Sequence, residues 1–390
     1  MKKKLFIFLF CTFTAASSGN FSSLMSGTEK LKGRDVKTES DFQIEDNSQY
    51  QKLARDIFKE LIEINTTSGY GSTKAAEAMA ARLKSAGFPD RDILVTGPDE
   101  QHKNLVFCFR GEGKLKPVLF ICHLDVVEAL RQDWSVDPFA FLEKDGYFYG
   151  RGTTDIKNDD AALITDVIRL KKEGYIPNRD IIIALTADEE MGNANGVNWL
   201  VTNQRDLIDA EFCINPDTAA ARRLSASSAY YNAMMRTTCV ATMMNAGHAE
   251  NALPNTAQTI INCRMLPDDN PDNVTSVLKS VLADSLISVT RTYASFTAPL
   301  SPLRNDFTDP VNQISASMWP GVNVSPIMST GATDGRYLRR MGIPVYGVSG
   351  MFGDMDDIRA HGKDERIGVK EFYNGVEFMY RFIKALSSEK

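Results

Sequence analysis

Apolar side chains recur along this chain with two different periods. A spacing of three and four residues, typical of an amphipathic helix, marks the segments 49–64, 73–86, 156–173 and 370–386. Short apolar runs, typical of buried strands, occupy 93–96, 104–109, 117–122, 180–190 and 211–215. Strands that alternate with helices of this length predict an α/β fold with a mostly parallel sheet and helices on both of its faces. A β-hairpin is expected to turn at Asp145-Gly146, between two short apolar stretches.

Composition and charge narrow the class of protein. The chain has 390 residues, which exceeds the size at which one hydrophobic core usually stops growing, so two domains are expected. Its apolar fraction of 43% and charged fraction of 24% are ordinary for a folded globular protein. The formal net charge of −6 comes without a basic block beyond the first residues. We therefore expect neither nucleic acid nor a membrane surface as a partner.

Residues 1–16 have the pattern of a secretory signal peptide. Lysines at positions 2–4 precede an apolar run over 5–13, and small residues follow at 14–16. The apolar run is too short to span a bilayer. We therefore expect an exported protein, periplasmic or secreted, that is free of the membrane after cleavage. Residues 17–47 are rich in Ser, Asp, Glu and Lys without periodicity, so a flexible leader is expected there.

Cysteines are few, and their pattern favours thiols. Cleavage of the signal would leave an odd number of them, at positions 108, 122, 213, 239 and 263. None forms a CxxC pair, and each lies in an apolar, strand-like run. The sequence therefore predicts buried free thiols rather than a disulfide.

Histidines and acidic residues follow the buried strands or occupy loops at five places. They are His123 with Asp125, then Asp155, then Glu189 with Glu190, then Asp217, and finally His361. Each has an ordinary structural explanation when it is taken singly. A lone histidine after a strand is usually a hydrogen-bonded loop residue, acids suit the start of a helix, and Asp155 could cap the helix that follows it.

Together these residues indicate a metal site. In an open α/β sheet, residues beyond the carboxyl ends of neighbouring parallel strands meet at one edge. Carboxylates gathered there would repel one another unless cations neutralise them. Two histidines with several carboxylates form a donor set suited to zinc, with cobalt or manganese as substitutes. Two zinc ions about 3.5–4 Å apart would form a site for metal-assisted hydrolysis.

The order of these motifs resembles a known family. HLDVV, DPF, YGRG with DIK, ADEE and a late histidine recur in the di-zinc exopeptidases and deacylases of the peptidase M20 type, which include aminoacylase and carboxypeptidase G. The resemblance covers about residues 50–217 and 235–388. It implies two zinc ions per chain and a hydrolase of amide bonds, with the main zinc domain formed by 48–217 and 311–390.

The resemblance also implies a role for each residue of the set. His123 corresponds to a ligand of one zinc ion, with Asp125 orienting its imidazole ring. Asp155 corresponds to the bridging ligand, and Glu189 to the general base. The remaining metal ligands correspond to Glu190, Asp217 and His361.

A smaller α+β domain, over residues 218–310, is implied as an insertion. Its predicted elements are strands at 238–244 and 256–265, a helix at 271–284 and a strand at 286–297. Asn251, Arg264 and Gly331 correspond to positions near the substrate, although Arg264 could equally be a surface residue of its strand.

This chain departs from the family in the inserted domain. Only twelve residues, 218–229, separate Asp217 from Tyr230, where the family carries a strand, a turn and a helix. The missing portion normally supplies the dimer contact and a histidine that reaches the reacting carbonyl. His248 is a conceivable substitute, but a loop residue at a strand end is the commoner role. The family dimer is therefore doubtful here, and we expect a monomer or a concentration-dependent aggregate.

Two functions remain open from the sequence. The first is an exported di-zinc hydrolase, of peptidase or deacylase type, that acts on small peptides or N-acyl amino acids. The second is a non-catalytic or weakly active metal-binding relative, because the inserted domain is shortened.

Overall fold

The structure is a computed structural model. It describes residues 48–191, 193–216, 236–247, 251, 256–266, 269–292, 298–322, 324, 326, 333–353, 357 and 359–388. Within these residues the chain divides into two compact units, one formed by 48–216 with 298–388 and one by 236–292. Among the described residues, no helix combines the length and apolar content that a membrane span requires. The domain boundaries expected from the sequence remain a prediction.

The larger unit is built on a six-stranded sheet. Its strand order is β1-β2-β6-β3-β7-β10. In chain order the strands are β1 (Ile93–Thr96), β2 (Asn104–Phe109), β3 (Val118–His123), β6 (Ile181–Thr186), β7 (Phe212–Ile214) and β10 (Val345–Tyr346). Pairs β3–β6, β3–β7 and β7–β10 are parallel, and pairs β1–β2 and β2–β6 are antiparallel. The predicted, mostly parallel sheet is confirmed.

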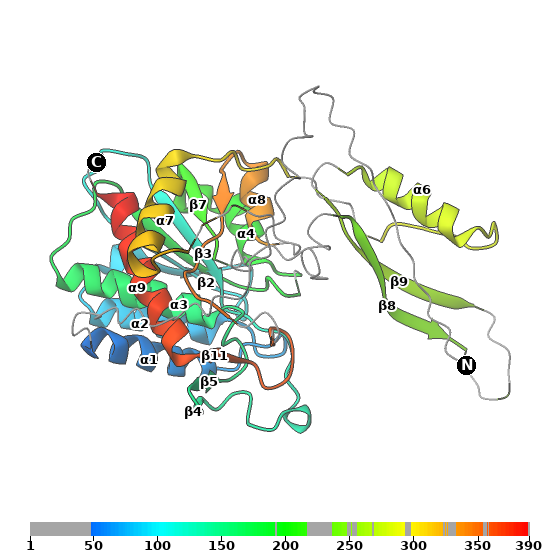
Figure 1. Cartoon of the computed structure of the whole chain (residues 1–390), viewed down its shortest axis with the longest axis horizontal. Coiled ribbons are helices and arrows are strands. Elements are labelled where there is room, and N and C mark those ends of the chain that lie inside the picture. Colours follow the sequence, from blue (N-terminus) through cyan, green and yellow to red (C-terminus); the bar gives the residue numbers. More distant parts are fainter. Residues whose placement is uncertain are drawn as a thin grey trace, which may run out of the picture. The chain divides into compact units, whose positions relative to one another are not determined.

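Helices cover both faces of this sheet, as expected (Figure 1). One face packs against α1 (Ser48–Glu63), α2 (Thr73–Ser85), α3 (Lys157–Lys172), α7 (Asn305–Met318) and α9 (Val369–Ser387). The other face packs against α4 (Gly196–Asn203) and α8 (Gly335–Arg340). Strand β3 shows why both faces are apolar: Phe120 and Cys122 enter the first core, while Ile121 enters the second. Successive side chains of a strand point to opposite faces.

A small three-stranded sheet lies in the same unit, in the order β11-β5-β4. Strands β4 (Leu142–Lys144) and β5 (Tyr147–Tyr149) form the predicted hairpin. The two turn residues have φ angles of 52° at Asp145 and 78° at Gly146. Positive φ at both positions is what a two-residue type I′ turn requires, and an Asp-Gly pair provides it. Strand β11 (Arg366–Gly368) pairs antiparallel with β5, which joins distant parts of the chain.

The smaller unit contains the hairpin of β8 (Thr238–Ala246) with β9 (Ala257–Arg264) and the helix α6 (Pro271–Leu282). These three elements confirm the predictions for 238–244, 256–265 and 271–284. The strand expected at 286–297 is not formed in its described part, because residues 286–292 are turn and coil. Within the described residues β8 and β9 pair only with each other, so no third strand extends this hairpin. Residues 293–297 lie outside the described part.

The cysteine prediction was wrong for one pair. Cys239 and Cys263 face each other across the β8–β9 ladder and form a disulfide. The three cysteines of the larger unit, at positions 108, 122 and 213, are free thiols as expected. The number of cysteines did not reveal this pair. The two side chains lie directly opposite each other only because of the register of the hairpin.

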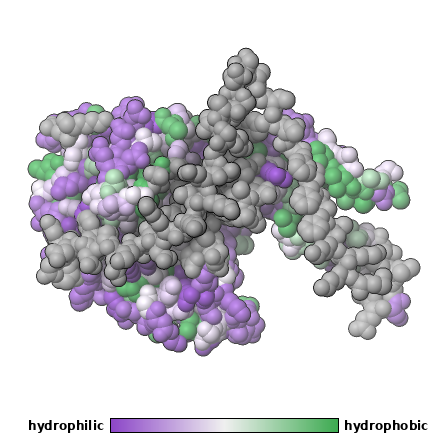
Figure 2. All heavy atoms as spheres, viewed as in Figure 1, coloured by the Kyte–Doolittle hydropathy of each residue, from purple (hydrophilic) through white to green (hydrophobic). Residues whose placement is uncertain are grey.

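The surfaces of the two units differ in polarity. The β8–β9 hairpin exposes Val240, Met243 and Met244, and Leu286 beyond α6 is 91% exposed. Figure 2 shows hydrophobic surface over α6, whereas the visible surface of the larger unit is mostly hydrophilic. Apolar side chains exposed in this way gain stability when another surface covers them. Whether another chain supplies that cover remains a prediction for the oligomeric state.

Candidate metal centre

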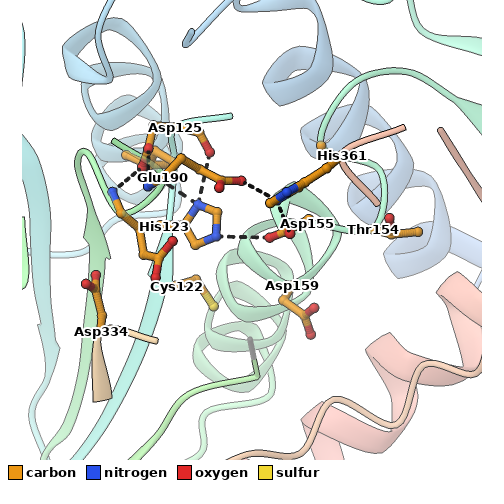
Figure 3. A network of polar contacts seen from close by, with 12 residues as sticks. Cys122, His123, Asp125, Thr154, Asp155, Asp159, Glu190, Asp334 and His361 are labelled. Atoms are coloured by element: carbon orange, nitrogen blue, oxygen red, sulfur yellow. Dashed lines mark hydrogen bonds and ion pairs between the residues drawn. The ribbon is translucent and has the colours of Figure 1, made fainter. Parts of the chain in front are cut away.

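Four loops at one edge of the large sheet carry the candidate residues. Strands β3 and β6 are parallel neighbours that pair His123 with Thr186, so the chain leaves both strands at the same edge. Asp125 follows the first strand, and Glu190 follows the second. Asp155 lies just before α3, and His361 lies in the segment that leads to β11. Figure 3 shows their side chains converging on one point.

Asp155 lies at the centre of the cluster. One of its carboxylate oxygens, Oδ1, is 3.1 Å from Nε2 of His123. The other oxygen, Oδ2, is 3.0 Å from Nε2 of His361. His361 Nε2 is also 2.9 Å from Oε1 of Glu190. Single ligand atoms of His123, Asp155 and Glu190 all lie within 4.8 Å of one another, so one cation could contact all three.

The cluster holds opposite charges in a largely buried place. Burial of His123 lowers its pKa, but the carboxylates of Asp155 and Asp125 outweigh burial and raise that pKa well above its usual value. Contacts with Asp155 and Glu190 raise the pKa of His361 to about 10. Burial raises the pKa of Asp155, but the two histidines overcome this effect and lower it. Without metal the imidazoles therefore hold protons, and metal binding must release them.

The arrangement fits divalent metal ions. Nitrogen and carboxylate oxygen are the donors that zinc accepts. The two histidines present Nε2 to different oxygens of Asp155, so this carboxylate could bridge two cations. Glu190 Oε1 is buried, and apart from its 2.9 Å ion-pair contact with Nε2 of His361 it has no hydrogen-bond partner among the described residues. Buried polar atoms normally have a partner, and a cation would provide one.

Asp125 acts differently from the expectation. Nδ1 of His123 is 2.9 Å from the main-chain carbonyl oxygen of Asp125, and 3.7 Å from the nearer carboxylate oxygen. The carboxylate instead accepts hydrogen bonds from the main-chain N–H groups of Glu189 and Glu190, each at 3.0 Å. Asp125 therefore fixes the imidazole through its main chain. Its side chain fixes the loop that carries the two glutamates.

Further residues brace this glutamate loop, and the sequence analysis did not single them out. The N–H of Ala187 donates to Oδ1 of Asn104 at 2.9 Å. The amide of Asn195 donates to Oδ1 of Asp334 at 2.6 Å, which ties the loop to the start of α8. Burial raises the pKa of Asp334 to about 6. No spacing rule in the sequence connects these positions. Only the polar TDGR segment around Asp334 could have indicated a functional residue.

Two residues beside the cluster have left-handed backbone conformations. The φ angle is 56° at Asp188 and 60° at His361. Such angles are uncommon for residues other than glycine, although Asp and His adopt them more readily than most. The Asp188 carboxylate accepts the N–H of Ala194, which closes the glutamate loop. This contact holds the turn at Asp188, directly before the two glutamates, in its left-handed conformation.

The structure describes only part of the remaining predicted positions. Asp217, Gly331 and His248 lie outside the described residues. Strand β7 ends at Ile214 beside β3, so the chain leaves the sheet at the same edge shortly before Asp217. Asn251 is exposed in a turn, and Arg264 is the last residue of β9; both belong to the smaller unit.

The sequence matches a known family over most of its length. The sequence model of peptidase family M20/M25/M40 matches residues 119–385. The chain belongs to this family. The family assignment confirms the resemblance and makes the chain a metal-dependent hydrolase of amide or peptide bonds. The matched region contains every candidate residue of the metal centre.

Individual relatives are distant in sequence. N-fatty-acyl-amino acid synthase/hydrolase PM20D1 of Bos taurus is 25% identical over 382 residues, covering 72% of this chain and 76% of that protein. Aminoacylase-1A of Rattus norvegicus is 27% identical over 334 residues, covering 70% and 81%.

Solved structures of the family share the fold. The metallo-carboxypeptidase Sso-CP2 from Sulfolobus solfataricus superposes with a TM-score of 0.69 at 13% identity, covering 85% of this chain and 99% of that one. The YXEP protein of Bacillus subtilis, described as a dinuclear metal binding peptidase, gives 0.60 at 13% identity, covering 87% and 98%. At this identity the likeness supports the fold alone.

Proposed function

We propose that this chain is a dinuclear zinc hydrolase that cleaves the amide bond of small peptides or N-acyl amino acids. One observation supports this most directly. His123, Asp155, Glu190 and His361 converge on one point of the sheet edge, and the glutamate before Glu190 is held beside them by Asp125. A base next to a metal cluster is the arrangement that metal-assisted hydrolysis needs.

The ligands divide naturally between two ions. His123 and Oδ1 of Asp155 would hold one, and Oδ2 of Asp155 with Glu190 and His361 would hold the other. We assign Asp217 to the ion beside His123, because β7 ends next to β3 and points the chain toward that side. The donor set favours zinc, and cobalt or manganese could replace it.

The reaction then follows from the positions of the side chains. Bound metal ions would polarise the amide carbonyl and make a water molecule more acidic. Glu189, partly exposed and anchored through its main-chain N–H, takes a proton from the attacking water. The same carboxyl group then delivers the proton to the leaving amine. The Asp125 carboxylate accepts the main-chain N–H groups of both Glu189 and Glu190, so it fixes the position of the base relative to the metal ligand during the reaction.

The substrate class is proposed from the relatives. The relatives named above are a synthase/hydrolase of N-fatty-acyl amino acids, an aminoacylase and a carboxypeptidase, so the shared chemistry is an amide bond beside a free carboxylate. The cation of Arg264 suits that carboxylate, and Asn251 and Gly331 are proposed to bind the substrate near it. Relatives of both peptidase and deacylase type match, and a substrate panel distinguishes the two.

The test combines metal analysis with one variant. Protein reconstituted with zinc should contain close to two equivalents and should hydrolyse a panel of dipeptides and N-acyl amino acids. Glu189→Gln should keep metal and fold but lose about 10²–10⁴-fold in turnover, because a proton acceptor is removed. Glu143→Gln, which alters an exposed glutamate paired with Arg55, is the control and should leave turnover unchanged.

Three outcomes would contradict the proposal. Saturation at one zinc equivalent or none would end the dinuclear assignment. If Glu189→Gln turned over substrate at the wild-type rate, Glu189 would not be the general base. A wild-type chain that binds two ions but hydrolyses none of the panel would favour the alternative, a non-catalytic metal-binding relative.

Export is proposed as well. The charged, apolar and small segments of residues 1–16 support a signal peptide. The disulfide between Cys239 and Cys263 is consistent with an oxidising compartment, where such bonds persist. Sequencing of the N-terminus of the protein recovered from outside the cytoplasm tests this, and an intact Met1 in that fraction would refute cleavage.

A further inference from the structure

A buried ion pair lies behind the metal cluster without touching its ligand atoms. We propose that this pair, Arg151–Glu365, is a positioning device that fixes Asp155 and His361 relative to each other. The inference rests on the proposed metal site, for which it identifies two residues beyond the ligands and the base. Asp155 and His361 come from distant parts of the chain, yet their ligand atoms lie 3.0 Å apart.

Glu365 organises the loop that leads into Asp155. Its side chain is fully buried, and its carboxylate accepts four hydrogen bonds. Oε1 accepts the main-chain N–H and the hydroxyl of Thr154, both at 2.8 Å. Oε2 accepts Nη1 of Arg151 at 2.6 Å and the N–H of Gly152 at 3.1 Å. The loop is thus folded around one carboxylate, and the last residue held is the one directly before Asp155.

Glycine is required at the middle of this loop. Gly152 has a φ angle of 88°, and an added Cβ would lie 2.9 Å from Val126 and 3.0 Å from Lys157. A side chain at this position would therefore strain the backbone and crowd Val126 and Lys157, which are packed against the loop.

Arg151 makes the matching connection to the loop of His361. Its second nitrogen, Nη2, donates to the carbonyl oxygen of Gly362 at 3.0 Å. Gly362 directly follows His361, which has the left-handed backbone described above. The guanidinium also lies over the ring of Trp134, 5.0 Å from its centroid, which limits its movement. One ion pair therefore holds the residue before one ligand and the residue after the other.

The main chain extends this connection. The N–H of Gly150 donates to the carbonyl oxygen of Glu365 at 3.2 Å, next to the pairing of β5 with β11. Figure 3 shows Thr154 close to Asp155 and His361. Metal ligands must be held within about 0.5 Å of their productive positions, so loss of this support should alter metal binding before it alters the fold.

The test measures metal affinity and the ligand field. Glu365→Gln keeps the size of the side chain, but its NH₂ group would face N–H or guanidinium donors and leave the Arg151 charge unpaired. The dissociation constant of the weaker zinc ion should rise about 10- to 100-fold, as changes behind a metal site typically produce. The visible absorption spectrum of the cobalt-substituted protein should also change, because the ligands move.

A matched control separates position from stability. Glu377 forms a similar ion pair with Arg169 at 2.8 Å, between α9 and α3. Glu377→Gln makes the same change there and should lower the unfolding temperature while leaving metal affinity and the cobalt spectrum at their wild-type values. Thr154→Val removes only the hydroxyl bond to Glu365, so it should weaken metal binding, but less than Glu365→Gln does. Thr154→Ser keeps the hydroxyl and should leave metal binding at its wild-type value.

The outcomes are distinguishable. If the wild-type chain bound no metal, the proposed function would fall, and this inference with it. If the wild type bound metal while Glu365→Gln and Thr154→Val matched it in affinity and cobalt spectrum, only the positioning role would be refuted. If Glu365→Gln did not fold, the comparison of Thr154→Val with Thr154→Ser would decide in the same way.

Discussion

Replacing Asp125 by asparagine tests how the structure positions the catalytic glutamate. Each oxygen of the Asp125 carboxylate accepts one main-chain N–H at 3.0 Å, from Glu189 and from Glu190. Asparagine keeps one acceptor oxygen, but its NH₂ group would face the other N–H. A hydrogen bond to a charged group contributes about 1.5–3 kcal/mol. Because about 1.4 kcal/mol corresponds to a tenfold change in rate, we expect kcat/KM to fall about 10- to 100-fold.

The resemblance to the family implied a different role for Asp125, namely orientation of the His123 imidazole. In the structure that ring is bonded to the main-chain carbonyl of Asp125, which the substitution leaves in place. Zinc content should therefore stay close to that of the wild type while kcat falls. The assay is steady-state hydrolysis of the best substrate of the panel, together with elemental analysis of the same samples.

A second buried aspartate provides the control. Burial raises the pKa of Asp166 on α3 well above its usual value, which favours the neutral carboxyl group that asparagine resembles. Asp166→Asn should therefore change neither kcat nor zinc content. Unchanged kcat/KM in Asp125→Asn would refute the role of its carboxylate. If the variant lost zinc but kept normal turnover per remaining ion, the carboxylate of Asp125 would act by orienting the His123 imidazole instead.

Two further predictions concern stability. Burial raises the pKa of Asp159 to about 7, so the folded chain keeps a proton that the unfolded chain loses near pH 4. The wild type should therefore lose at most about 4 kcal/mol of stability between pH 4 and pH 7 through this group. Asp159→Asn should lack that loss and should be more stable than the wild type at pH 8, as measured by urea unfolding. Equal slopes of the unfolding free energy against pH in the two proteins would contradict this. Replacing Cys239 and Cys263 together by serine opens a link between residues 24 positions apart and should lower the stability of the β8–β9 unit by about 3 kcal/mol. Calorimetry measures that change, and a simultaneous loss of zinc would show that the two units are coupled.

The hydrophobic pattern by itself determined the elements of the larger unit. Strands β2, β3 and β6 and helices α1, α2 and α3 lie where the periodicity predicted them. This works because the period of a strand or helix decides which side chains are buried. The positions of the strands also located His123, Asp125 and Glu190, since residues that follow neighbouring parallel strands share one edge of the sheet. The order of motifs identified the family.

Tertiary structure decided which groups touch each other. The sequence could not show that the Asp125 carboxylate binds two N–H groups, or that Arg151 and Glu365 form one buried pair. Nor could it pair Cys239 with Cys263, because their approach depends on the register of a hairpin. Periodicity fixes the face on which a side chain lies, whereas hydrogen bonds, ion pairs and disulfides require atoms within a few ångströms. That proximity arises only when segments far apart in the chain pack together.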